Sequence, residues 1–423
     1  MDNNIQREYK SNLLWLSLLS LIAFLNYFFG NDFMALAATG LSCLYVVICD
    51  ESYLLPSMMF MNSFAYLFRF NQFSLYAFVC LAFILRSGLK EKRRITNALI
   101  VGIPYLFLHL FSTNILRLSF ADIVPFILLL TLYFAACEYT SNERDAILSY
   151  FAIGHAISTF WGFFKSFTRL DSILGQDYVS AVSWADTTRF SGISFDPNFY
   201  TLMAIIVLCV LAFSLHDKLP NAVWIPLFIT TLVGGALTFS KSFYLCAIIL
   251  LGYFIVARVK RVSLGEIRMA IIAALLCYIF RDKIINVIDI FLKRFDSSDS
   301  LDGLTTGRWS TWGNYISQIK DSFYTIAVGH GILSGGMKAA HNLFLEMLYK
   351  FGALGTLFDA LYLVLCNKEM KIRTKRKMMS VLVIALYASL LFNLSAYSFA
   401  GFWATVFVVM LVVSDDIQYE ETV

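Results

Sequence analysis

Two neighbouring stretches decide how the rest of the sequence is interpreted: residues 307–312 (GRWSTW) and residues 341–346 (HNLFLE). The first stretch is polar and aromatic, and the second opens an apolar run that contains Gly352 and Gly355. A polar loop therefore runs directly into an apolar helix, with an arginine and an imidazole near the boundary. We interpret the remaining sequence as a membrane scaffold that holds this loop.

The composition is typical of a multi-span membrane protein. Apolar residues make up 59% of the chain and charged residues only 15%, whereas soluble domains carry about a quarter charged residues. Apolar runs close to the length that crosses a bilayer recur along the sequence. We predict an all-α polytopic membrane protein, a helical bundle of about 12–14 transmembrane helices in one integral membrane domain, residues 1–423. The first apolar run follows Arg7 and Lys10 without a small-residue cleavage site, so we expect it to be retained.

Lys and Arg in the short loops predict the orientation of these helices. The expected spans are residues 11–29, 33–49, 53–69, 72–86, 97–112, 119–137, 146–166, 198–214, 222–238, 241–257, 266–281, 342–366, 378–394 and 397–413. With these spans, the basic clusters at 86–94, 258–268 and 368–377 all fall on the same side as both termini. Basic loops mark the cytoplasmic side, so both termini are expected there.

The same assignment places two long loops on the outer face, residues 167–197 and 282–341. Long polar loops in so apolar a chain suggest a functional role. Residues 283–295 carry a broad apolar stripe and are expected to lie along the membrane surface. Residues 308–323 place two tryptophans and Ile316 on one face at helical spacing.

The first outer loop ends in a candidate phosphate site. Arg189 lies shortly before Asp196, Pro197 and Asn198, where the next apolar run begins. A helix N-terminus with a nearby arginine suits phosphate. Two structural alternatives remain open: Asp196 caps the helix, and Arg189 forms an ion pair with Asp196 or Asp186.

Two further basic residues lie on the outer side. Lys241 belongs to a tight turn, residues 238–242, and either extends to the membrane interface or adds positive charge to an outer cavity. Arg308 has a guanidinium fork that matches phosphate, and the neighbouring Trp309 and Trp312 could stack on a sugar ring.

His341 is the candidate general base, because histidine can accept a proton near neutral pH. A capping or packing role at the helix start is the alternative. Asn342 and Glu346 are four residues apart and share a helix face. Glu346 is also four residues from Lys350, and an ion pair would make both tolerable in a bilayer.

Several signals for other chemistries are missing from the sequence. It contains no Asp-x-Asp, P-loop or Gly-x-Ser-x-Gly pattern, and its five histidines lack metal-ligand spacing. The acidic run at 296–302 is interpreted as a solvated loop, and the eight cysteines fall in or at the ends of apolar runs, not in a disulfide framework. We expect no metal, no cofactor and no nucleic-acid partner.

The motifs together resemble a known family. They are Arg189-x-x-Gly192-x-x-x-Asp196-Pro197-Asn198, Thr238-x-Ser240-Lys241, Gly307-Arg308-x-x-x-Trp312, Gly329-x-Gly331, His341-Asn342-x-x-Leu345-Glu346-x-Leu348 and Gly352-x-x-Gly355. In order and spacing, over residues 185–360, they resemble the O-antigen polymerase and ligase superfamily (Wzy and WaaL type). The resemblance implies a metal-independent glycosyltransferase of the GT-C type at the outer face of the bacterial cytoplasmic membrane.

The resemblance also implies roles for individual residues. Arg189 and Arg308 would contact the diphosphate of an undecaprenyl-diphosphate-linked oligosaccharide, and His341 and Asn342 would lie near the acceptor hydroxyl. Lys241 stands where many relatives carry arginine, and lysine lacks the bidentate fork. The implied partners are the lipid-linked donor and acceptor, membrane lipids and a chain-length regulator.

Three functions fit these features. The leading hypothesis is a polysaccharide polymerase that moves the growing chain onto a fresh lipid-linked repeat unit. The second is a ligase that moves the finished chain onto lipid A-core, whose phosphates would favour a basic outer surface. Loop 282–341 carries balanced charges, which favours the polymerase. The third is a lipid-linked oligosaccharide flippase or other transporter, which would carry coupling charges near the bilayer middle.

Overall fold

The computed structural model describes residues 3–29, 32–70, 73–91, 94–97, 99–100, 102, 120–168, 189–194, 196–258, 308–331, 339–371, 377–392, 394 and 400–414, with residues 278, 281, 285 and 289. Several sequence-based expectations lie wholly or mostly outside these residues: the spans at 97–112 and 266–281, the surface segment at 283–295, the acidic run at 296–302 and most of the loop at 167–197.

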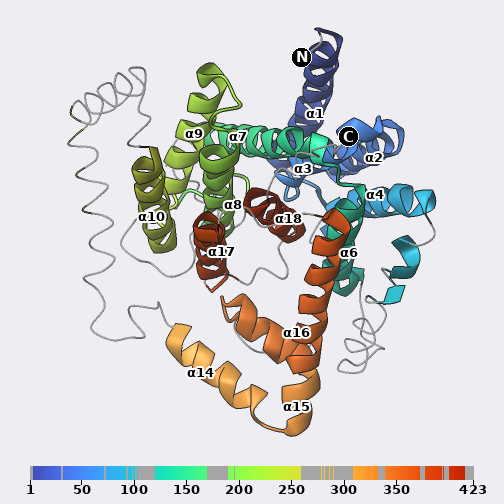
Figure 1. The fold of residues 1–423 in the computed structure, drawn as a ribbon, viewed down its shortest axis with the longest axis vertical. Helices are drawn as coiled ribbons and strands as arrows, with labels where there is room; N and C mark the ends of the chain where they lie inside the picture. Colours follow the sequence, from blue (N-terminus) through green and yellow to red (C-terminus); the bar gives the residue numbers. More distant parts are fainter. Residues whose placement is uncertain are drawn as a thin grey trace, which may run out of the picture.

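The described part of the chain is helical apart from one small hairpin (Figure 1). The helices are α1 (Asn3–Phe29), α2 (Asp32–Ile48), α3 (Glu51–Asn62), α4 (Tyr76–Lys90), α6 (Phe120–Glu138), α7 (Arg144–Thr168), α8 (Pro197–Val210), α9 (Asn221–Ala236), α10 (Lys241–Arg258), α14 (Arg308–Ile319), α15 (Phe323–Val328), α16 (Leu343–Met370), α17 (Lys377–Leu391) and α18 (Phe402–Val413). A 3₁₀ turn, η2 (Ser141–Glu143), precedes α7, and a π-helical turn, η4 (Leu211–Leu215), extends α8. The prediction of an all-α polytopic membrane protein is confirmed.

Three helices of the described part are long and apolar enough to cross a membrane by length and composition: Ser141–Phe164, Pro197–Leu215 and Leu343–Met370. In the other helices of this part the apolar segments are shorter, at 10–17 residues, for example Asn12–Leu25 and Lys241–Ala257. Their positions follow the spans expected from the sequence, with most boundaries shifted by only a few residues. The total number of spans stays a prediction.

The third expected span, residues 53–69, is wrong in length. Helix α3 ends at Asn62, and the backbone then makes tight turns in which the amides of Ser63 and Phe64 bond the carbonyls three residues back. A two-residue antiparallel hairpin, β1 (Arg69–Phe70) with β2 (Phe73–Ser74), leads into α4. Polar residues in and around this hairpin interrupt the apolar run, so the helix cannot continue as a span.

One end of the helix bundle is tied together by polar contacts of α7. The Lys218 ammonium lies 2.7 Å from the Asp145 carboxylate, which joins the chain after α8 to the start of α7. Buried Arg144 donates two hydrogen bonds to the Leu411 carbonyl near the end of α18, at 3.0 and 3.2 Å. Figure 1 shows both chain termini at the same end, with α14 and α15 at the opposite end.

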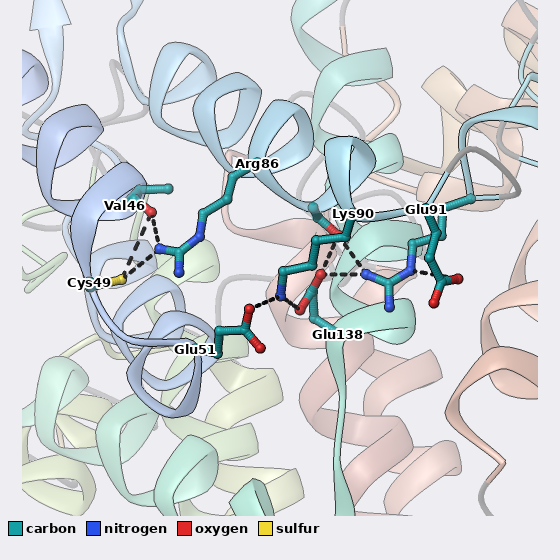
Figure 2. A network of polar contacts seen from close by, with 9 residues as sticks. Val46, Cys49, Glu51, Arg86, Lys90, Glu91 and Glu138 are labelled. Atoms are coloured by element: carbon teal, nitrogen blue, oxygen red, sulfur yellow. Dashed lines mark hydrogen bonds and ion pairs between the residues drawn. The ribbon is translucent and has the colours of Figure 1, made fainter.

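A second polar network ties α3, α4 and α6 together (Figure 2). The Glu138 carboxylate accepts hydrogen bonds from Ser87 at 2.7 Å, from Lys90 at 2.8 Å and from Arg94. Lys90 also lies 3.0 Å from Glu51. The sequence assigns these helix ends to the cytoplasmic side, and the network brings them into contact with one another. Which face meets the cytoplasm stays a prediction.

Helix α8 runs through the centre of the bundle and is buried along almost its whole length. Its Tyr200 hydroxyl lies 2.7 Å from the hydroxyl of Thr159 on α7. The Tyr200 ring also packs under Gly192, where an added Cβ atom would come within 2.7 Å of the ring, and Gly192 has φ 61°. Only glycine fits this close, left-handed turn without strain. The contact holds the loop that carries Arg189 against the start of α8.

Candidate functional site

Helix α16 is bent sharply at Gly352, and the bend shapes the site. Gly352 has φ 62° and ψ −169°, a conformation open to glycine but not to other residues without strain. Residues 343–351 therefore run at an angle to residues 353–370, which rise along α6 (Figure 1). The expectation of one continuous span at 342–366 is corrected: the straight segment of about 27 Å begins only after the bend.

The bend leaves helix carbonyls that need hydrogen-bond donors. The Gly329–Gly331 turn supplies them, because the His330 amide donates to the Tyr349 carbonyl at 2.7 Å and the Gly331 amide donates to the Lys350 carbonyl at 2.8 Å. Both glycines of this turn have positive φ. The motif Gly329-x-Gly331 thus acts as a cap on the first part of α16.

Aromatic rings complete this unit. The His330 ring stacks on Tyr349 with centroids 4.5 Å apart, and Tyr349 meets Tyr315 of α14 edge to face at 4.9 Å. Helices α14, α15 and the first part of α16 therefore form one packed group at the end of the bundle away from the termini (Figure 1).

His341 is held on both sides by fixed backbone. The indole Nε1 of Trp312 donates to the carbonyl of Ala340 at 2.8 Å. On the other side, the Asn342 side chain caps α16 by accepting from the Leu345 amide at 3.2 Å. His341 itself has φ 49°, a left-handed conformation that is uncommon outside glycine but that histidine adopts more readily than most residues.

Four charged or titratable side chains influence one another around His341. Half-buried His341 interacts electrostatically with Arg308, Asp196 and Glu346. Burial, and then the positive charge of Arg308, lower the pKa of His341 below its usual value. Burial also lowers the pKa of Arg308, and the Asp196 carboxylate opposes that shift. The His341 imidazole is therefore favoured in its neutral form, which can accept a proton.

Arg189 is anchored by hydrogen bonds to neutral groups. Its Nε donates to the Thr238 carbonyl at 2.8 Å, and its Nη2 donates to the Asn198 side-chain oxygen at 3.3 Å. The amide of Phe190 donates to the Leu237 carbonyl at 3.0 Å. The loop of Arg189 is thus joined directly to the turn at 238–241.

Asp196 caps α8, as one of the sequence-based alternatives expected. One carboxylate oxygen accepts from the Asn198 amide at 2.7 Å, and Pro197 occupies the first helical position. Its charge nevertheless acts on both Arg308 and His341. A capping residue of α8 therefore also belongs to the charged group around His341.

The remaining predicted residues fall into different surroundings. Lys241 is half-buried at the start of α10, in the same turn whose Thr238 carbonyl binds Arg189. Glu346 is buried. Burial of Tyr315 raises the pKa of that residue to about 12, and the negative charge of Glu346 adds to the shift. Trp309 is 57% exposed, whereas Trp312 is engaged in packing and in the Ala340 contact. Phosphate or sugar contacts of these residues stay predictions.

An apolar cavity of about 340 Å³ lies beside this group, between α6, α16, α17 and α18. Leu343 and Phe344, which directly follow Asn342, form part of its wall. Asp359 also lines it and is only 8% exposed, and in the described part of the chain its Oδ2 has no hydrogen-bond partner. Sequence reasoning missed this residue, although an acidic residue inside an apolar span was a visible signal.

Comparison with known families bears on these motifs. A family model described as O-Antigen ligase matches residues 226–358. This match supports a relationship between this segment and the O-antigen polymerase and ligase superfamily. The matched residues contain the 238–241 turn, α14, the Gly329–Gly331 turn and the bend of α16, so the site described above lies largely in the family segment. No curated protein and no solved structure matches the chain.

Proposed function

We propose that this protein is a polysaccharide polymerase of the GT-C type. It transfers a growing glycan from undecaprenyl diphosphate onto a lipid-linked repeat unit at the outer face of the bacterial cytoplasmic membrane. The observation that carries this proposal is the electrostatic group of Arg308, Asp196 and His341 beside an apolar cavity. In this proposal residues 167–197 and 282–341 are outer loops that both contribute to the group, and both termini lie in the cytoplasm.

The proposed reaction forms a bond between the acceptor oxygen and the anomeric carbon of the donor sugar. The bond from that carbon to the diphosphate oxygen breaks, and the electron pair leaves with undecaprenyl diphosphate. His341 accepts the proton of the acceptor hydroxyl, which its lowered pKa permits near neutral pH. Arg308 and Arg189 stabilise the negative charge of the leaving group without a metal ion.

The burial of Arg308 supports its part in this reaction. A cation in a partly dry site interacts more strongly with a phosphate than a fully hydrated cation does. Arg189 is already fixed by its bonds to Thr238 and Asn198. Prearranged charge of this kind needs little reorganisation when the diphosphate departs.

The apolar cavity supports a lipid-linked donor. A polyprenyl chain needs an apolar path that starts where its diphosphate is bound. The cavity wall begins at Leu343, two residues after His341, and continues along α16. The lipid tail would therefore lie in the membrane while its diphosphate remains at the charged group.

The ligase is the second candidate, because the matching family description is that of an O-antigen ligase. The discriminating experiment supplies the purified protein, in lipid nanodiscs, with its lipid-linked repeat unit either alone or with lipid A-core. Ladder growth on the repeat unit alone is the expected result. Transfer only to lipid A-core would show that the protein is a ligase and not a polymerase. Movement of the repeat unit across the membrane of vesicles without new glycosidic bonds would show that it is a flippase.

A further inference from the structure

We propose that the exposed face of α14 is a saccharide-binding subsite, centred on Gly313 and walled by Trp309. The subsite holds a sugar ring of the lipid-linked glycan next to the bond that is made or broken. This inference rests on the proposed function and extends the sugar contact expected of Trp309 to the exposed face of α14 around Gly313.

Helix α14 has two clearly different faces. One face packs against α16 through Trp312, Tyr315 and Ile319. Residues on the opposite face are exposed and share a lack of charge; they are Trp309, Ser310, Gly313, Asn314, Ile316 and Ser317. Helical spacing brings Trp309, Gly313 and Ile316 into one row, with the amide and the two hydroxyls beside it.

Gly313 is the informative position on this face. Glycine within a helix is less stable than alanine by about 1 kcal/mol. In the described part of the chain no neighbouring atom requires glycine here, because a Cβ atom on Gly313 would meet nothing within 4 Å. The missing side chain instead leaves a flat, open floor one turn from the exposed ring of Trp309.

The chemistry of this face matches a pyranose ring. An indole offers an apolar plane for the C–H face of a sugar, and asparagine and serine offer both hydrogen-bond donors and acceptors for its hydroxyls. A face buried against lipid would be more apolar, and the core of a protein interface would be too. The row is mixed, uncharged and shallow, which favours a glycan.

The position of the row also fits a glycan. Arg308, in the charged group with His341, is the first residue of the same helix. Gly313 lies about 7.5 Å further along the helix axis. A glycan whose reacting end lies at Arg308 would therefore pass over Gly313 as it leaves the site.

The test compares Gly313→Leu with Gly252→Leu in the purified full-length protein. Gly252 is the matched control, because it is also helical and an added Cβ atom there would also meet nothing within 4 Å among the described residues. The probe is the water-soluble oligosaccharide released by mild acid from the lipid-linked repeat unit. Binding is followed by calorimetry, chain extension by KM and kcat, and folding by the melting temperature.

We expect Gly313→Leu to weaken oligosaccharide binding about tenfold or more and to raise KM with little change in kcat, as loss of uniform binding does. The melting temperature should not fall, since leucine favours helix over glycine. Gly252→Leu should match the wild type in binding. Gly313→Ala, with a smaller side chain, should show the same effect to a lesser degree.

Wild-type binding and KM in Gly313→Leu would overturn the subsite while leaving the polymerase intact. The wild type could instead extend no chains but bind the oligosaccharide more tightly than Gly313→Leu does. That result would support the subsite and contradict the proposal of a polymerase. Loss of a co-purifying protein from Gly313→Leu, with oligosaccharide binding retained, would show that the face serves a protein partner and would also overturn the subsite.

Discussion

Gly329 and Gly352 lie backbone to backbone: a Cβ atom on Gly329 would come within 2.6 Å of the Gly352 amide nitrogen. A Cβ atom on Gly352 would in turn come within 2.5 Å of the Ala327 carbonyl. Two glycine motifs that are distant in the sequence therefore form a single contact. It joins the end of α15 to the bend of α16 and so sets the direction of the first part of α16, which begins two residues after His341.

We expect Gly329→Ala and Gly352→Ala each to lower stability by about 2–5 kcal/mol. Each adds a methyl group to a contact without space, at about 1–3 kcal/mol, and each puts a side chain at positive φ, at about 1–2 kcal/mol. The measurement is the melting temperature in detergent, with chain extension as the second readout. Gly40→Ala is the control, because its Cβ would meet nothing within 4 Å. If all three variants have the same melting temperature, this would contradict the close contact between Gly329 and Gly352.

Trp312 is expected to act by positioning the backbone before His341. Trp312→Phe removes its hydrogen bond to the Ala340 carbonyl and should cost about 0.5–1.5 kcal/mol of stability. Trp224→Phe is a matched control, because the Trp224 indole donates to the Leu211 carbonyl at 2.9 Å, away from the site. Both variants should lose similar stability, and only Trp312→Phe should lower kcat. Equal kcat in the two variants would show that Trp312 has only a structural role.

Arg308 and His341 are expected to be required for chain extension. Arg308→Lys keeps the charge but loses the fork, and we expect a rate loss of about 10²–10³, as for removal of one preorganised donor. His341→Ala should abolish extension at unchanged protein abundance. Lys218→Ala is the control, since its exposed ion pair with Asp145 lies at the opposite end of the bundle. Normal polysaccharide from cells that carry the His341→Ala variant would show that this histidine is not the general base.

The pH profile should report His341. The neutral imidazole accepts the proton, so the rate is high above its pKa and falls as the pH drops through it. Burial and Arg308 place that pKa below the ordinary 6.5, so the acid limb should lie below pH 6.5. Glu346 raises this pKa; Glu346→Gln should therefore move the limb to lower pH, whereas Asp217→Asn, near the other end of the bundle, should not move it. If Glu346→Gln moves the acid limb to higher pH, this would contradict the assignment of the limb to His341.

Much of the scaffold was predictable because apolar runs and basic loops follow directly from the physics of the bilayer. The exceptions are local. The span at 53–69 failed because the sequence alone does not show where a polar interruption ends a helix. The bend at Gly352 was also missed, because a glycine within an apolar run is tolerated in a straight helix as well; its effect depends on Gly329, which lies in another element.

For the site, the sequence indicated the side chains but not what holds them. Arg189 bonds to the Thr238 carbonyl and Trp312 to the Ala340 carbonyl. Backbone carbonyls exist at every residue and leave no signal in a sequence. The double role of Asp196, as cap and as charge partner of Arg308 and His341, likewise depends on three elements that only the fold brings together.

Asp359 provides the test of the apolar cavity. Its carboxyl is 8% exposed, and one of its oxygens has no hydrogen-bond partner among the residues that the structure describes. Such a group costs about 1–3 kcal/mol. Asp359→Leu removes this cost and fills part of the cavity, so we expect a higher melting temperature. If the polyprenyl chain occupies the cavity, the same variant should also raise KM for the lipid-linked repeat unit. Binding of the soluble oligosaccharide, which has no lipid tail, should stay unchanged.

Asp359→Asn is the control for this pair of effects, because it keeps both the size and the polarity of the side chain. It should leave the melting temperature and KM close to those of the wild type. A gain in stability for Asp359→Leu without any change in KM would mean that the lipid tail lies elsewhere. An equal loss of affinity in both variants would point instead to a direct contact between the carboxylate and the substrate, since leucine and asparagine share only the absence of that charge.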